Sequence, residues 1–141
     1  MSRVGASAGA ALFVTDAKTF FDTPALQEEI FGPASLVVLC PSLEDFNSCA
    51  EALEGQLTAT VWGNSEELNT QPALLWTLEQ KAGRIVFNGF PTGVEVGTAM
   101  VHGGPFPATT DSRYSSVGTR AIYRFVRPVA WQTPGTSREN H

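Results

Sequence analysis

The sequence predicts an α/β fold in which a mostly parallel sheet is flanked by helices. Short β-prone runs alternate along the chain with segments of helical periodicity. Strands that are joined through helices at this spacing form right-handed crossovers, which build parallel sheets. A chain of 141 residues, with 43% hydrophobic and 16% charged residues, also has the size and composition of one globular domain.

Four runs rich in β-branched and apolar residues predict the strands. They cover residues 10–15, 35–40, 57–62 and 84–88. The second run is continuously apolar rather than alternating, which is typical of a strand buried on both faces. All four runs are expected to share one sheet.

Capping residues and prolines predict where the helices begin. Helices are expected at residues 17–21, after Thr23-Pro24, after Ser42, after Asn64 and over residues 116–126. The second of these has Thr23 as its N-cap and Pro24 in the first helical position, and it should end within two turns, near Glu28-Glu29. The fourth contains Pro72, which is expected to split or kink it.

The C-terminal third of the chain departs from this alternation. Residues 89–115 form a loop rich in glycine and proline, and a loop of that length inside a compact domain is usually functional or disordered. Residues 128–132 could form an exposed, apolar edge strand, which invites pairing with another chain. We therefore expect a domain over residues 1–126 and an oligomerisation strand and tail over residues 127–141.

Charge and composition exclude several classes of protein. The net charge of −5 argues against binding of nucleic acid, although the charge after residue 100 is locally positive, at +3 against −8 before it. No apolar run reaches the roughly 18 residues that a membrane span requires. Cys40 and Cys49 are too few for a disulfide framework, so both are expected to be structural. The sequence predicts a soluble, cytoplasmic protein without a bound metal.

One stretch carries residues suited to binding chemistry, namely Glu28-Glu-Ile-Phe-Gly-Pro33. A carboxylate can accept hydrogen bonds from two hydroxyl groups of a sugar, and a phenyl face can support a flat heterocycle. The plain alternative is that the two glutamates are solvated while Ile30 and Phe31 fill a core. Spacing alone favours that alternative.

The same stretch resembles the signature of the NAD(P)-dependent aldehyde dehydrogenases. The resemblance continues in order through further segments and covers nearly the whole chain. These segments are Leu57-Thr-Ala-Thr-Val-Trp62, Ala82-Gly-Arg-Ile-Val-Phe-Asn88, His102-Gly-Gly-Pro-Phe-Pro-Ala-Thr-Thr110 and Ser116-Val-Gly118. The histidine-containing segment departs from the commoner Pro-Phe-Gly-Gly ending and resembles the branch that acts on 2-oxoglutarate semialdehyde (2,5-dioxopentanoate), often with NADP.

The resemblance implies that this chain is the C-terminal part of such an enzyme and contains part of its catalytic domain. In the family, the second acid of the signature holds the nicotinamide-side ribose and the aromatic ring packs beside the nicotinamide, roles that fall on Glu29 and Phe31. For a whole enzyme it implies attack of a cysteine on the aldehyde, hydride transfer to NADP or NAD, and hydrolysis of the thioester. The family's nucleophilic cysteine, general-base glutamate and dinucleotide fold have no counterpart in these 141 residues. No catalytic residue is therefore assigned, and the chain alone is expected to have no turnover.

Three residues of the long loop and its start are candidates for the substrate channel. Asn88 ends a strand where ligand contacts gather in open α/β sheets, although it could instead satisfy the backbone of a turn. Phe90 and Phe106 match the place of aromatic residues that line the family's substrate tunnel. Plain packing under a long loop is the alternative for both.

Two ionisable residues complete the candidate substrate site. Histidine is the side chain best suited to proton transfer at neutral pH, so His102 could act as a base or contact the substrate, or it could simply point to solvent. Arg113 could bind a substrate carboxylate through two hydrogen bonds. An ion pair with Asp111 is the alternative.

Two other functions remain open on the sequence alone. The chain could be a catalytically inactive fragment that serves as an assembly or interaction module, with residues 128–132 as the contact. It could also be a free-standing ligand-binding α/β domain. As part of a dehydrogenase, it is expected to act on an aldehyde and to form a homo-oligomer through the C-terminal strand.

Overall fold

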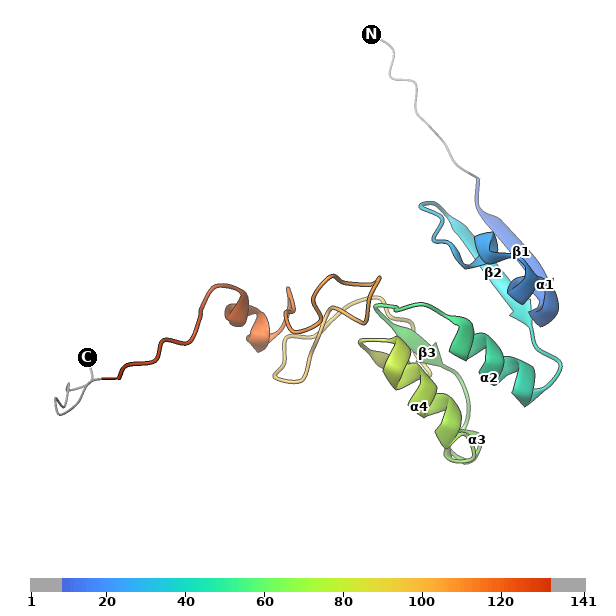
Figure 1. Cartoon of the computed structure of the whole chain (residues 1–141). Helices are drawn as coiled ribbons and strands as arrows, with labels where there is room; N and C mark the ends of the chain where they lie inside the picture. The colour runs from blue at the N-terminus through green and yellow to red at the C-terminus, as the bar shows by residue number, and fades with distance from the viewer. Residues whose placement is uncertain (1–8, 133–141) are drawn as a thin grey trace, which may run out of the picture.

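The computed structural model describes residues 9–132, which contain four strands, four α-helices and two 3₁₀ helices. Their order is β1 (Ala11–Asp16), α1 (Ala17–Asp22), η1 (Pro24–Gln27), β2 (Ala34–Leu39), α2 (Leu43–Ala52), β3 (Ala59–Val61), α3 (Ser65–Asn69), α4 (Pro72–Lys81), β4 (Ile85–Phe87) and η2 (Thr119–Arg124). All but η2 lie in one half of the molecule, and the chain after β4 returns to this half near Gly103 and Gly104 before it extends away toward η2 (Figure 1). The α/β class is confirmed.

The strands form two parallel pairs rather than the single sheet that the sequence predicts. β1 pairs with β2 over six residues, from Ala11 opposite Ala34 to Asp16 opposite Leu39. β3 pairs with β4 over three, from Ala59 opposite Ile85 to Val61 opposite Phe87. Among residues 9–132 no strand joins the two pairs. Helix α2 connects the halves instead, because it contacts α1 on one side and α4 on the other.

Local sequence accounts for the elements around the first pair. The Asp16 carboxylate accepts a hydrogen bond of 2.7 Å from the Thr19 backbone N–H and so caps α1. Pro24 occupies the start of the next helix as predicted, but that helix is a single 3₁₀ turn, and the Thr23 side chain makes no capping bond. The expectation that β2 is buried on both faces is wrong, because its residues alternate between half-buried and exposed.

The helices of the second half begin where the sequence places them. Ser42 accepts a hydrogen bond from the Asp45 backbone N–H and caps α2. Asn64 and Glu67 form a reciprocal capping box at α3. Pro72 starts α4, so the predicted split of this helical segment is confirmed.

The hydrophobic core is small and lies between α2, α4 and the second strand pair. Its buried members are Ala50, Val61, Leu74 and Leu78, with half-buried aliphatic residues around them. None of the large side chains of residues 9–132 is fully buried. The surface instead carries many exposed hydrophobic residues, which single globular domains normally cover. Much of the apolar surface of this chain therefore lacks a covering layer.

The long glycine-rich loop docks on this body through close backbone contacts. A side chain on Gly83 would overlap the carbonyl oxygen of Gly103, and one on Gly104 would overlap that of Gln56. Beyond the loop, the helix expected over residues 116–126 is only the short 3₁₀ helix η2. Gly118 precedes it with a φ of 79°, a left-handed conformation that glycine adopts without strain.

The expected edge strand at residues 128–132 does not form within the chain, and these residues are exposed. The remainder of the predicted tail, residues 133–141, lies outside the described residues. None of the helices between residues 9 and 132 has the length and apolar character needed to cross a membrane.

Candidate functional site

The residues predicted to hold the cofactor lie in an exposed loop between η1 and β2. Glu29 is exposed, and Phe31 is 92% exposed, with Gly32 and Pro33 leading into the strand. The expectation that the glutamates follow a helix end is confirmed, since Glu28 is the C-cap of η1. The alternative that Phe31 fills a core of this chain is wrong. Both side chains are accessible to a ligand from one loop.

Asn88 follows β4 and ties two strand ends together. Its side-chain oxygen accepts a hydrogen bond of 2.9 Å from the Gly63 N–H, and its side-chain nitrogen donates one of 2.8 Å to the Gly63 carbonyl. Its φ of 49° lies in the left-handed region, which asparagine tolerates better than most residues. The side-chain amide of Asn88 therefore satisfies backbone hydrogen-bonding groups. These groups belong to the β3–α3 connection rather than to the turn that contains Asn88. Contact with a substrate stays a prediction.

Phe90 stands next to this connection but is largely open to solvent. Its ring meets that of Trp62 edge-on, with 5.4 Å between the centroids and 62° between the planes. Phe90 remains 78% exposed and Trp62 60%. The pair forms an aromatic surface at the end of β3 that has no covering layer among the described residues. Phe106, also 78% exposed, lies in the loop that docks over Gln56, and the structure does not bring it into contact with this pair.

The structure shows Arg113 in an ion pair with Asp111, which was the alternative to binding a substrate carboxylate. Its Nε and Nη2 atoms donate hydrogen bonds of 2.9 and 2.7 Å to the two carboxylate oxygens of Asp111. The Arg113 guanidinium and backbone N–H hold the pKa of the Asp111 carboxyl at about 2. The Arg113 guanidinium also lies 5.7 Å from the centre of the Tyr114 ring. A free guanidinium for a substrate is therefore not available at this position without breaking the pair.

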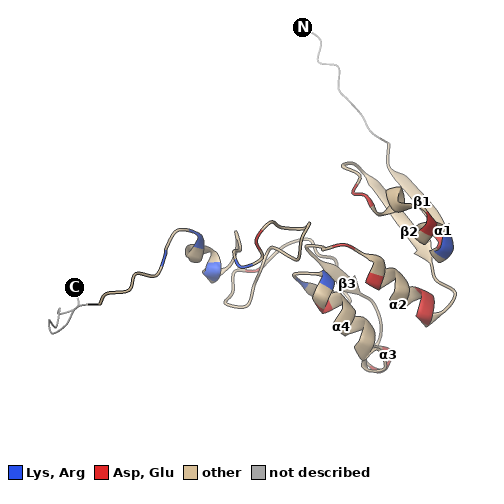
Figure 2. Ribbon diagram, viewed as in Figure 1, with Lys and Arg blue, Asp and Glu red and all other residues tan. Residues whose placement is uncertain are grey.

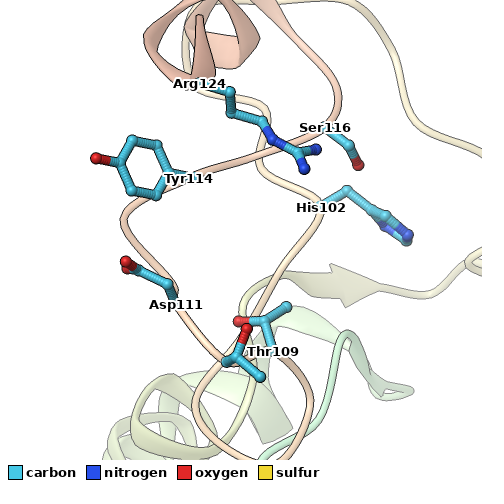
Figure 3. Close-up of a pocket in the computed structure, with 7 residues that line it drawn as sticks. His102, Thr109, Asp111, Tyr114, Ser116 and Arg124 are labelled. Atoms are coloured by element: carbon cyan, nitrogen blue, oxygen red, sulfur yellow. The ribbon is translucent and has the colours of Figure 1, made fainter. Parts of the chain in front are cut away.

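His102 is the one predicted site residue that lines a described cavity. This polar cavity has a volume of about 350 Å³ and is bounded by the long loop and η2 (Figure 3). Its other lining residues are Thr109, Thr110, Asp111, Tyr114, Ser116 and Arg124. Figure 3 shows the Arg124 guanidinium reaching back from η2 toward Ser116 and His102.

The cavity has the donors that an anion requires. Arg124 makes no ion pair with any residue between 9 and 132, and the hydroxyl groups of Thr110 and Ser116 can donate hydrogen bonds. Figure 2 shows that basic residues gather in this part of the chain, whereas the charged residues of α2 are all acidic. The arrangement can bind a carboxylate.

Buried Ser115 holds the cavity wall in place. Its hydroxyl accepts a hydrogen bond of 3.0 Å from the His102 backbone N–H and donates one of 2.8 Å to the Val117 carbonyl. Sequence reasoning missed both Ser115 and Arg124. Ser115 borders a quoted motif but shows no periodicity, and Arg124 registered only as part of the basic tail.

The two cysteines lie beside each other in the structure, and the structural role expected for them stays a prediction. Their sulfur atoms lie 3.7 Å apart, with Cys40 after β2 and Cys49 in α2, and both are free thiols. Burial raises the pKa of the Cys49 thiol to about 11, and the contact with Cys40 adds to the shift. A nucleophilic cysteine requires the opposite shift. No group of three potential metal ligands occurs among the residues that the structure describes.

Taken alone, the fold and these sites define an α/β chain with an exposed acid–aromatic loop and a small polar cavity. No protein-family model matches the chain. Two curated relatives are similar to it. Alpha-ketoglutaric semialdehyde dehydrogenase 2 of Azospirillum brasilense is 53% identical over 125 residues, and alpha-ketoglutaric semialdehyde dehydrogenase of Acinetobacter baylyi is 56% identical over 109 residues.

These matches cover 89% and 77% of this chain, but only 24% and 21% of the relatives. The chain therefore spans less than a quarter of the length of either relative. The predicted resemblance to the aldehyde dehydrogenase family is confirmed, and the chain is homologous to a segment of semialdehyde dehydrogenases of that family.

Proposed function

We propose that this chain acts as part of an NAD(P)-dependent dehydrogenase that oxidises 2-oxoglutarate semialdehyde to the dicarboxylic acid. The observation that carries the proposal is the identity of 53% and 56% to two proteins that both bear this activity in their names. We place the chain in the C-terminal part of that enzyme, in the cytoplasm and in a homo-oligomer. The catalytic cysteine and general base would come from polypeptide outside these 141 residues.

The exposed loop before β2 supports a role in holding the cofactor. The donor set fits, because Glu29 offers a carboxylate that accepts hydroxyl hydrogen bonds and Phe31 offers an aromatic face, both accessible from solvent. When bound, NADP or NAD supplies the hydride acceptor. Glu29 would orient the ribose and Phe31 would limit the movement of the adjoining ring, so both act by positioning.

The long loop supports a role on the substrate side. The substrate carries a carboxylate, and Arg124 with His102 lines a cavity suited to an anion. The aromatic surface of Trp62 and Phe90, together with Phe106, would form apolar wall of the channel. Asn88 would contribute by holding the β3 and β4 ends in register, and Arg113 by fixing the loop through Asp111.

A chimera tests this proposal. The matched 125 residues of the Azospirillum brasilense relative are replaced by those of this chain, and NADP-dependent oxidation of the semialdehyde is measured. We expect activity in the chimera and none in the isolated 141-residue chain. Glu29→Gln should raise the KM for the cofactor and lower kcat, whereas the matched control Glu28→Gln should leave both nearly unchanged. A folded but inactive chimera, or equal effects of the two substitutions, would contradict the proposal.

The exposed hydrophobic surface also favours the second candidate, an inactive module that serves assembly. Removal of residues 127–141 tests whether an oligomer forms through the C-terminal strand or through another part of the exposed surface. Loss of an oligomer on size-exclusion chromatography, with catalysis absent in the chimera, would support this second function. Retention of the oligomer after the truncation would exclude the C-terminal strand as its contact.

A further inference from the structure

The two cysteines form a dithiol pair that belongs neither to the buried core nor to the residues proposed for the cofactor and the substrate. Cys40 follows β2 and Cys49 lies in α2, and their sulfur atoms are 3.7 Å apart. The sequence contains no third cysteine. Each thiol therefore has one possible sulfur partner within the chain, and that partner already lies beside it.

The geometry of the pair is close to that of a disulfide. A disulfide bond requires a sulfur–sulfur distance of about 2.05 Å, so the two atoms must approach each other by about 1.7 Å. Rotation of the side chains about their Cα–Cβ bonds moves the sulfur atoms without moving the backbone. The other contact of Cys40 Sγ opposes this movement little, since the Val38 carbonyl oxygen is 3.9 Å away and a thiol is a weak donor.

Both thiols are within reach of a small reagent. They are half-buried, and both line the apolar cavity of about 1050 Å³ beside α2. Oxidation of a cysteine depends on access to its sulfur atom as well as on its ionisation. A molecule as small as hydrogen peroxide can therefore enter and contact either sulfur.

The surroundings of Cys49 define the order in which the two thiols react. Burial raises the pKa of the Cys49 thiol to about 11, and the hydrogen bond with Cys40 and the negative charges of a Cys40 thiolate and of Asp45 add to the shift. The thiolate is the form of cysteine that attacks an oxidant. Cys40 is therefore the attacking thiol, and Cys49 is the neighbouring thiol that resolves the product.

We propose that Cys40 and Cys49 form a site of reversible oxidation, at which hydrogen peroxide converts the two thiols into an intrachain disulfide. The inference goes beyond the proposed function and does not depend on it, because both sulfur atoms belong to this chain.

The reaction has two steps. The Cys40 thiolate attacks one oxygen of the peroxide and the O–O bond breaks, which leaves a sulfenic acid on Cys40 and releases hydroxide that is protonated to water. The Cys49 sulfur then attacks the Cys40 sulfur, the S–O bond breaks, and hydroxide leaves as water with the proton of the Cys49 thiol. The pair loses two electrons, and the peroxide that accepts them becomes two molecules of water. A dithiol reductant restores both thiols by exchange.

The disulfide closes a ring over residues 40–49, which contains most of α2. The Phe46 N–H donates to the Ser42 carbonyl inside this ring and forms the first backbone hydrogen bond of the helix. Closing the ring restricts the open conformations of this segment, so the bond should break less often. In the described part of the chain β2 and α2 share little packing, so the disulfide adds a tie that side chains do not supply.

Peptide mapping of the oxidised chain tests the bond itself. The reduced 141-residue chain is treated with a stoichiometric amount of hydrogen peroxide, the remaining thiols are blocked, and the chain is cleaved after glutamate. Cleavage at Glu44 separates Cys40 from Cys49, so the disulfide leaves peptides 30–44 and 45–51 joined. We expect the joined peptides at every protein concentration, with an intact mass lower by about 2 Da for the loss of two hydrogen atoms. Dithiothreitol should separate the peptides.

Matched serine variants test the order of reaction, with dimedone as the label for sulfenic acid. In Cys49→Ser the sulfenic acid on Cys40 has no resolving thiol, so labelling should be about tenfold stronger than in the unsubstituted chain. Cys40→Ser should be labelled about tenfold less than Cys49→Ser, because the raised pKa of Cys49 keeps its sulfur protonated.

Hydrogen exchange tests the effect on α2. The Phe46 amide should exchange about threefold more slowly in the oxidised chain than in the reduced chain. The Leu75 amide, which bonds to the Gln71 carbonyl at the start of α4, lies outside the ring and should change less.

Three outcomes would overturn the proposal. They are peptides that stay separate or join only between two chains, equal labelling of the two serine variants, and exchange at Phe46 that oxidation leaves unchanged. The peptide map and the exchange measurement use the unsubstituted chain, so they decide the matter even where a serine variant fails to fold.

Discussion

Replacing Asn88 should loosen the connection between β3 and α3. Asn88→Gly keeps the left-handed conformation but removes both hydrogen bonds to the Gly63 backbone. These bonds are exposed to solvent, so we assign each the low end of the usual range, and the local loss is about 1 kcal/mol. Asn88→Ala removes the same bonds and should cost about 1 kcal/mol more than Asn88→Gly, because alanine is strained at a φ of 49° and, unlike asparagine, has no polar side chain to offset that strain.

Hydrogen exchange of the Gly63 amide measures this loss locally. A change of about 1 kcal/mol corresponds to roughly fivefold faster exchange for Asn88→Gly, and about 2 kcal/mol to roughly thirtyfold for Asn88→Ala. The Phe46 amide, which bonds to the Ser42 carbonyl in α2, should be unchanged and serves as the internal reference. Unchanged exchange at Gly63 in both variants, or equal rates in the two, would refute the reasoning.

Three further predictions concern the core, a half-buried thiol and an exposed ion pair. Leu78→Ala should lower the free energy of unfolding in urea by about 2–3 kcal/mol because it opens a cavity in the core, whereas Leu43→Ala, at an exposed position, should cost much less. Cys49 should react with iodoacetamide at pH 7.5 about a hundredfold more slowly than a thiol of ordinary pKa, because the thiolate is the reactive form. The reaction rate should rise until the pH reaches about 11, and a rate that levels off below pH 9 would contradict the raised pKa. The Asp111 carboxyl has a lowered pKa, so its pairing with Arg113 should hold at neutral pH and be lost only as the pH falls through about 2. Arg113→Gln should return the midpoint of the Asp111 titration, measured by NMR, toward 3.8. A midpoint near 3.8 in both proteins would show that the pair does not form in solution.

The local elements follow from short-range features of the sequence. Ser42, Asn64 and Pro72 start helices through capping bonds and a fixed φ, which depend on neighbours within four residues and so can be read from the chain. The family motifs likewise gave the resemblance that the two relatives confirm.

How these elements meet depends on long-range contacts that the sequence does not reveal. The separation into two strand pairs depends on which edges find partners, and β-prone composition carries no information about a partner absent from the chain. The pairing of Arg113 with Asp111 and the tie between Asn88 and Gly63 depend on backbone geometry that no periodicity reports. Side chains such as Phe31 and Phe46 are apolar enough to predict burial, yet they are exposed, because burial requires a surface to cover them as well as an apolar side chain.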